Sequence, residues 1–178
     1  MTVPSLEELG ERVCILGPSN AGKSTLAQAI GRQRQLPVVH LDQLYHLPNS
    51  DWVPRQTRDF LRLHEEAIAQ ERWVMDGNYS NCTPQRLARA TGLILLELPT
   101  MTSLLRYLRR CWFERERAGG LPGGRDSVKW GMLRHIAVVT PKNRPKRQAF
   151  YDNATQPKLL LATPRDLQQF YECEGLSR

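Results

Sequence analysis

The eight residues from Gly17 to Ser24 constrain the fold of this chain more than any other part of its sequence. They read Gly-Pro-Ser-Asn-Ala-Gly-Lys-Ser and lie between a short apolar run at 12–16 and a stretch with helical spacing at 22–33. Glycines let the backbone curl so that successive N–H groups point inward, and a helix that follows directs its positive end to the same point. This strand–loop–helix pattern, GxxxxGK[ST], is typical of a loop that wraps the phosphates of a nucleotide.

The loop predicts a nucleoside triphosphate and Mg²⁺ as ligands. Lys23 is expected to reach the β- and γ-phosphates, and Ser24 is expected to bind the metal. The residues expected to contact the nucleotide are Gly17, Ser19, Asn20, Ala21, Gly22, Lys23, Ser24 and Thr25. A GTPase switch is disfavoured, because the sequence contains no [NT]KxD tetrad that would read a guanine base.

The rest of the chain alternates buried-strand patterns with helical patterns, which favours an α/β fold with a parallel sheet covered by helices on both faces. Strands are predicted at 12–16, 37–41, 72–75, 93–98 and 159–162. Helices are predicted at 22–33, from Pro54 onward, at 84–90, from the fourth strand to about 117, at 127–139, at 146–153 and after a capping box at 163–166. The length of 178 residues favours one domain that spans 1–178.

Two aspartates directly follow predicted strands, Asp42 after the second and Asp76 after the third. The carboxyl ends of parallel strands share one crevice, so both side chains are expected beside the nucleotide. There they could order the waters of a metal, orient an acceptor hydroxyl or accept its proton, and we predict Asp76 as a metal ligand together with Ser24. The alternative is that each aspartate only caps a turn. His40 and His46, which flank Asp42, are open to interpretation as substrate contacts or structural histidines.

Basic residues gather in the segment 103–147, which holds nine arginines and three lysines against three acidic residues. Arginine suits bidentate contacts with phosphate, so a nucleotide or a nucleic acid is expected as a partner of this segment. Arg106, Arg110 and Arg117 are the candidates for phosphate contacts. For any one of them, a solvated helix face is the alternative explanation.

Cysteine usage and hydropathy favour a cytoplasmic protein. The four cysteines are far apart and form no CxxC pair, which argues against a disulfide framework or structural zinc. No apolar run reaches the length of a membrane helix, and the acidic stretch at the N-terminus lacks the apolar core of a signal peptide. We therefore expect no membrane partner, and the sequence does not predict the oligomeric state.

With these residues identified, the chain resembles the P-loop kinases of the adenylate kinase-like group. It is most similar to the bacterial proteins labelled DNA topology modulation protein or adenylate kinase-related. The matching segments are ILGPSNAGKSTLA (15–27), VVHLDQLYH (38–46), RWVMDGNYS (72–80), RLARATGLILLELP (86–99) and LLRYLRRCW (104–112). The resemblance implies a three-layer P-loop NTPase fold with a five-stranded parallel sheet, ATP as the nucleotide, and a short arginine-rich lid at about 115–126.

The resemblance also implies roles for individual residues. Asp76 matches the acidic residue in the Asp-Gly turn of nucleoside monophosphate kinases, and Arg106 or Arg110 matches arginines near the base and phosphates of the donor. Catalytic roles are expected for Lys23, Asp42, Asp76, Arg110 and Arg117, and acceptor contacts for Asp42, Tyr45, Asp76, Gly77, Asn78 and Tyr79. Those kinases continue after Asp-Gly with an aromatic residue, proline and arginine. Here the sequence is Asn-Tyr-Ser, which argues against AMP as the acceptor.

The sequence therefore predicts an ATP-dependent phosphotransferase, either a nucleoside monophosphate kinase-like enzyme or another small-molecule kinase. It would transfer the γ-phosphoryl group of ATP to a small acceptor that the sequence does not identify. The alternative is a nucleotide-binding regulatory ATPase that acts on or near DNA through the basic segment 103–147.

Overall fold

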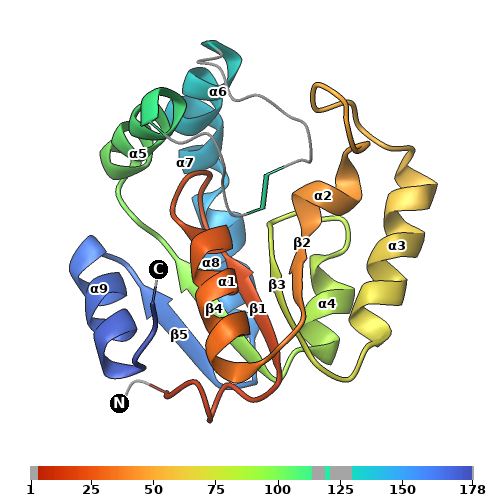
Figure 1. The fold of residues 1–178 in the computed structure, drawn as a ribbon, viewed down its shortest axis with the longest axis vertical. Helices are drawn as coiled ribbons and strands as arrows, with labels where there is room; N and C mark the ends of the chain where they lie inside the picture. Colours follow the sequence, from red (N-terminus) through yellow and green to blue (C-terminus); the bar gives the residue numbers. More distant parts are fainter. Residues whose placement is uncertain (1–3, 114–118, 121–129, 178) are drawn as a thin grey trace.

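The computed structural model describes residues 4–113, 119–120 and 130–177, apart from the side chains of Arg110 and Phe113, and has one parallel sheet between layers of helices (Figure 1). The five strands lie in the order β2-β3-β1-β4-β5, and every ladder between neighbours is parallel. Their bounds are β1 Arg12–Leu16, β2 Val38–His40, β3 Trp73–Asp76, β4 Gly92–Leu96 and β5 Lys158–Leu161. The predicted five-stranded parallel sheet is confirmed.

The helices follow the predicted alternation, with some differences in their bounds. They are α1 Lys23–Arg34, α2 Leu41–Tyr45, α3 Thr57–Ala69, α4 Thr83–Arg89, α5 Thr100–Phe113, α6 Trp130–Arg134, a π-helical turn η1 His135–Val139, α7 Thr140–Lys142, α8 Arg144–Asn153 and α9 Pro164–Cys173. Among the described residues, no helix has the length and apolar character needed to cross a membrane.

The prediction that Pro54 opens a helix is wrong. Pro54 forms an isolated antiparallel bridge with His46, and α3 begins only at Thr57. The Arg55 N–H donates to the Tyr45 carbonyl at 2.7 Å, so the backbone here pairs with a distant segment before any helix can begin. This pairing closes a loop directly after the short helix α2, which the sequence pattern did not predict.

Residues that alternate along the strands divide the core into two layers, as the period of a strand requires. Val13 and Ile15 of β1 face a cluster to which α1 and α9 contribute. Cys14 and Leu16 face the opposite cluster, into which α3, α4 and α8 pack. Because helices cover both faces, the strands are continuous apolar runs, and polar side chains are left to the loops at the strand ends.

The capping box predicted at the start of α9 is present. The Asp166 N–H donates to Thr163 Oγ1 at 3.1 Å, and the Thr163 N–H donates to Asp166 Oδ2 at 2.9 Å. Pro164 occupies the first turn, where a missing N–H costs nothing.

We expect Thr163→Ala to lower the free energy of unfolding by about 1 kcal/mol, because it removes the acceptor for an otherwise unsatisfied helical N–H. Urea denaturation measures the change. Thr163→Ser, which keeps the hydroxyl, is the matched control and should stay close to the unsubstituted protein. An alanine variant of unchanged stability would show that the box contributes nothing to folding.

Candidate nucleotide and acceptor site

The predicted phosphate loop leaves β1 at Leu16 and enters α1 at Lys23. Gly17 and Gly22 have φ angles of 150° and 99°, in the region that glycine tolerates best. A Cβ atom on Gly17 would also lie 2.4 Å from the carbonyl oxygen of Leu96, so no larger residue fits against β4. The glycines at both ends of the motif are therefore required by the backbone itself.

The Lys23 ammonium group lies over this loop, where its Nζ donates to the Pro18 carbonyl at 2.8 Å. Burial lowers the pKa of Lys23, and the negative charges of Asp76 and Asp42 oppose that shift. The next residue, Ser24, bonds directly to one of these two carboxylates, Asp76. Phosphate oxygens bound in the loop would take the place of the Pro18 carbonyl as its partners.

Asp76, the last residue of β3, has both carboxylate oxygens in hydrogen bonds. Ser24 Oγ donates to Oδ2 at 2.7 Å, and His40 Nδ1 lies 2.5 Å from Oδ1. The Ser24 hydroxyl and the Asp76 carboxylate are oxygen donors of the kind that Mg²⁺ prefers. No group of three or more histidine, cysteine or acidic side chains suited to a metal occurs among the described residues. A Mg²⁺ ion held here would therefore take its other ligands from phosphates and water.

Asp42, which is exposed on α2, lies in a second group of residues beside the phosphate loop. This group, called the Asp42 wall or acceptor wall below, consists of Asp42, Tyr45, Phe60 and Tyr79. Tyr79 Oη donates to Asp42 Oδ1 at 2.6 Å. The Tyr79 ring lies 4.9 Å from that of Tyr45 and 5.1 Å from that of Phe60, between ring centroids. Burial and the Asp42 charge raise the pKa of Tyr79, so the phenol remains a neutral donor. Asp42, Tyr45 and Tyr79, all predicted acceptor residues, thus lie together.

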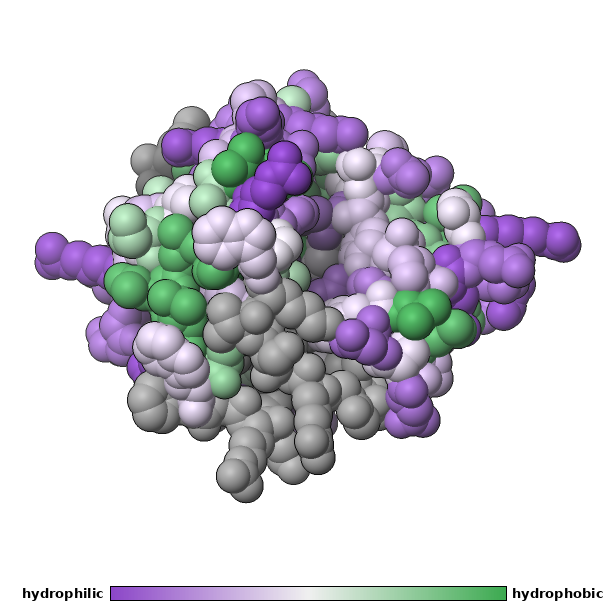
Figure 2. All heavy atoms as spheres, turned by 90° about the horizontal axis from the view of Figure 1, so that it is seen from above, coloured by the Kyte–Doolittle hydropathy of each residue, from purple (hydrophilic) through white to green (hydrophobic). Residues whose placement is uncertain are grey.

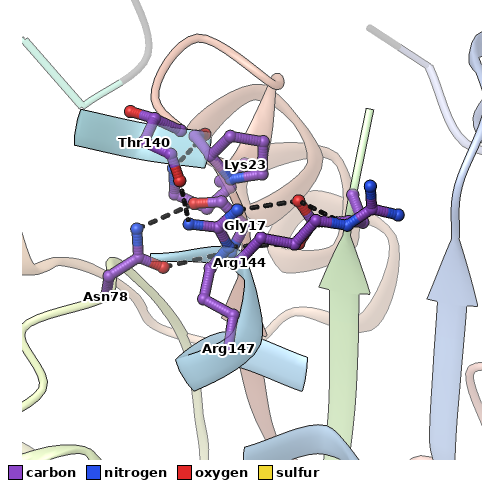
Figure 3. Close-up of polar contacts among 8 residues, drawn as sticks. Gly17, Lys23, Asn78, Thr140, Arg144 and Arg147 are labelled. Atoms are coloured by element: carbon purple, nitrogen blue, oxygen red, sulfur yellow. Dashed lines mark hydrogen bonds and ion pairs between the residues drawn. The ribbon is translucent and has the colours of Figure 1, made fainter. Parts of the chain in front are cut away.

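Asn78 has a different environment from its neighbour Tyr79. Its Oδ1 accepts from the Gly17 N–H at 3.1 Å, and its Nδ2 donates to the Gly17 carbonyl at 2.8 Å (Figure 3). The buried Arg86 guanidinium donates in turn to the carbonyl of Gly77 at 2.8 Å. The loop after β3 is therefore tied to the phosphate loop, and the Asn78 amide is engaged there rather than in the acceptor wall.

The other predicted nucleotide contacts differ in accessibility. Ser19 and Asn20 are half-buried, Thr25 is exposed, and Ala21 is buried, so only the backbone of Ala21 can meet a ligand. Arg106 on α5 donates through Nη1 to the Ala21 carbonyl at 2.6 Å, which places this guanidinium beside the loop.

The predicted lid at 115–126 lies outside the described residues except for Gly119 and Gly120. Arg117 and the side chain of Arg110 also lie outside them. Gly119 packs closely against Ser24 and His40, because a Cβ atom on it would lie 2.9 Å from Ser24 Oγ and 3.0 Å from His40 Nδ1. Gln43 Nε2 donates to the Gly120 carbonyl at 2.8 Å.

A buried ion pair between Arg147 and Glu97 lies beside the phosphate loop and was not predicted from the sequence. Arg147 on α8 donates to both oxygens of Glu97, at 2.7 and 3.1 Å, and to the Thr140 carbonyl at 3.0 Å (Figure 3). Arg144 Nε lies 3.9 Å from the same carboxylate, and its side chain is 67% exposed. These residues and Pro18 line a cavity of about 280 Å³. Glu97 could have been found by the signal that identified Asp76, an acidic residue at a strand end.

Seen from above the carboxyl ends of the strands, the surface is hollowed between the part formed by α5 and the part formed by α2 and α3 (Figure 2). A phosphate loop that follows the central strand of a parallel sheet, with carboxylates after the strands beside it, defines a P-loop nucleotide-binding fold.

Comparison with solved structures supports this fold. The gluconokinase from Sinorhizobium meliloti 1021 matches with a TM-score of 0.57 at 13% identity, over 93% of this chain and 89% of that one. Shikimate kinase from Acinetobacter baumannii, in complex with shikimate, matches with a TM-score of 0.54 at 15% identity, over 93% of both chains. Shikimate kinase from Bacteroides thetaiotaomicron matches with a TM-score of 0.50 at 17% identity, over 93% of this chain and 99% of that one. No protein-family model and no curated protein matches the sequence. At these identities the likeness shows a shared fold.

We expect Asn78→Ala to weaken nucleotide binding by about 30-fold, because the two lost hydrogen bonds to Gly17 contribute roughly 1 kcal/mol each to the loop geometry. Calorimetric titration with ADP measures the affinity. Asn81→Ala, an exposed position three residues further on, is the matched control. Equal affinities for the two variants would show that Asn78 does not hold the loop.

Proposed function

We propose that this chain is an ATP-dependent small-molecule kinase, which transfers the γ-phosphoryl group of ATP to a hydroxyl group of a small acceptor. One observation carries the proposal: Asn78 bonds to the backbone of Gly17 in the phosphate loop, and the next residue, Tyr79, donates to Asp42. The phosphate loop and the Asp42 wall therefore border one another, as transfer between two bound substrates requires. The fold shared with proteins described as gluconokinase and shikimate kinase supports the same class.

The hydrogen bonds of the two aspartates support a division of tasks. Asp76 is directed toward Ser24 and His40, which suits the binding of Mg²⁺ or of its waters. Asp42 is exposed, and among the described residues only Tyr79 hydrogen-bonds to its carboxylate. Asp42 is therefore the group available to orient an acceptor hydroxyl and to accept its proton.

ATP would supply the transferred phosphoryl group, and Mg²⁺ would neutralise charge on its oxygens. The backbone of 17–24 and Lys23 would hold the phosphates, and Ser24 and Asp76 would hold the metal. Arg106 is in position to contact the nucleotide beside Ala21. Arg144, exposed beside Glu97 and the Pro18 side of the loop, is the described arginine that we assign to the transferring phosphoryl group.

We infer that the acceptor carries no phosphate group. After Asp-Gly, the Asn78 amide is used by Gly17 and the Tyr79 hydroxyl by Asp42. The residues after Asp-Gly are Asn-Tyr-Ser, so these positions present no arginine to an acceptor phosphate, which favours an unphosphorylated hydroxyl compound over AMP. We also infer a relationship to the DNA topology modulation protein group, on the segments 38–46 and 72–80 that supply this wall.

A screen of nucleosides, nucleoside monophosphates, sugars and small acids with Mg-ATP, scored by ADP release, tests the proposal. With the acceptor found, Asp42→Asn should lower kcat by at least about 100-fold, since it removes a general base, and leave ADP affinity unchanged. Lys23→Ala should abolish turnover. Asp152→Asn, remote on α8, is the control. Normal transfer by Lys23→Ala would contradict the site, and no acceptor-dependent ADP release across the panel would favour the regulatory reading.

One observation favours the second candidate, a nucleotide-binding ATPase that acts on DNA. Trp112 and Trp130 are 69% and 81% exposed, and no described residue between Leu98 and Tyr151 is acidic. Hydrophobic residues gather over α5 in Figure 2, with hydrophilic residues around them. Exposed aromatic rings and arginines are the groups on which single-stranded nucleic acid stacks.

If this second reading is correct, affinity for an oligonucleotide should fall by more than about tenfold between roughly 50 and 200 mM salt, because several phosphates release counterions. Fluorescence anisotropy with labelled single- and double-stranded DNA measures it. Weak or salt-insensitive binding would remove this candidate.

A further inference from the structure

His40, which the sequence left open as a substrate contact or a structural histidine, lies beside the carboxylate that we assign to the metal. It is the last residue of β2 and is paired in register with Asp76, the last residue of β3. The two side chains are only 7% and 6% exposed, and His40 Nδ1 is 2.5 Å from Asp76 Oδ1. Among the described residues of the site, no other histidine side chain pairs with a carboxylate in this way.

The Asp76 carboxylate is buried, so each of its oxygens needs a hydrogen-bond donor. A buried charged group is tolerated only with hydrogen-bond partners, and Asp76 has Ser24 on Oδ2 and His40 on Oδ1. Because a carboxylate only accepts, the contact puts a proton on His40 Nδ1. The Nδ1–H of His40 fixes the rotation of the Asp76 carboxylate about the Cβ–Cγ bond, so that Oδ2 faces Ser24.

The surroundings keep the imidazole in this orientation. The backbone at Gly119 lies against His40 Nδ1 and Ser24 Oγ, so it covers the place where His40, Asp76 and Ser24 meet. Metal-binding carboxylates are commonly oriented by hydrogen bonds of this kind from residues that do not touch the metal.

We propose that His40 is a positioning residue for the Mg²⁺ that accompanies the nucleotide: its Nδ1–H holds Oδ1 of Asp76 so that Oδ2, together with Ser24, is presented to the metal. The inference rests on the proposed nucleotide site and deepens it. His40 itself touches neither metal nor nucleotide in this arrangement.

The test compares the affinity for ADP in Mg²⁺ with that in EDTA, by calorimetry, and needs no acceptor. His40→Leu removes the donor, and the affinity for Mg²⁺ in the ADP complex should fall by about 10- to 100-fold. Affinity for ADP in EDTA should not change, because the phosphate loop is intact. His40→Asn, whose amide N–H can replace Nδ1–H, should restore the Mg²⁺ effect, whereas His40→Gln, whose amide reaches the place of Nε2, should not.

His46→Leu is the matched control, because His46 Nδ1 bonds to the backbone carbonyl of Asp42 and not to Asp76. It should keep the ratio of the two affinities. The proposal is wrong if His40→Leu keeps this ratio, if it weakens binding equally in both conditions, or if the asparagine and glutamine variants behave alike. Should His40→Leu fail to fold, the asparagine–glutamine pair decides. An unsubstituted protein that binds no ADP would overturn the nucleotide site itself, and this inference with it.

Discussion

The carboxylate of Asp76 joins three parts of the chain that are distant in sequence. Ser24 lies in the first turn of the helix after the phosphate loop, His40 ends the edge strand of the sheet, and Asp76 ends the strand between that edge and β1. A buried carboxylate without partners would be costly, so the three elements must meet in this register for the sheet edge to form. The same contacts hold Ser24, His40 and Asp76 together beside the phosphate loop, at the position where the proposed function would place the metal.

Much of the fold could be predicted from the sequence, because its signals are local. The glycine and lysine positions of 17–24 and the apolar runs of the strands depend on backbone conformation and burial near each residue. The segment at 45–55 could not be predicted in the same way. Proline at 54 is compatible with the first turn of a helix, but the backbone pairing of 45–47 with 53–55 decides its conformation.

The part of the candidate site that could be predicted is the placement of residues at the carboxyl ends of the strands. Asp42 and Asp76 follow strands, so their location at the sheet edge could be inferred, but the direction of each side chain could not. Adjacent residues in the turn after β3 illustrate this: Asn78 bonds to the loop and Tyr79 to Asp42. The pairing of Glu97 with Arg147 spans fifty residues and carries no spacing signal at all.

That buried pair bears on how the arginine-rich part of the chain can act. Removing two charges from water is costly enough that such a pair contributes little net stability, so its consequence is mainly positional. The Glu97 carboxylate accepts two hydrogen bonds from Arg147, and the Thr140 carbonyl accepts a third, which fixes α8 against the end of β4. Arg144, one turn earlier on that helix, lies 3.9 Å from the same carboxylate, and its side chain stays exposed. Under the proposed function, this fixed helix would hold the exposed Arg144 beside the cavity that Pro18 of the phosphate loop also lines, where its charge could meet a transferring phosphoryl group.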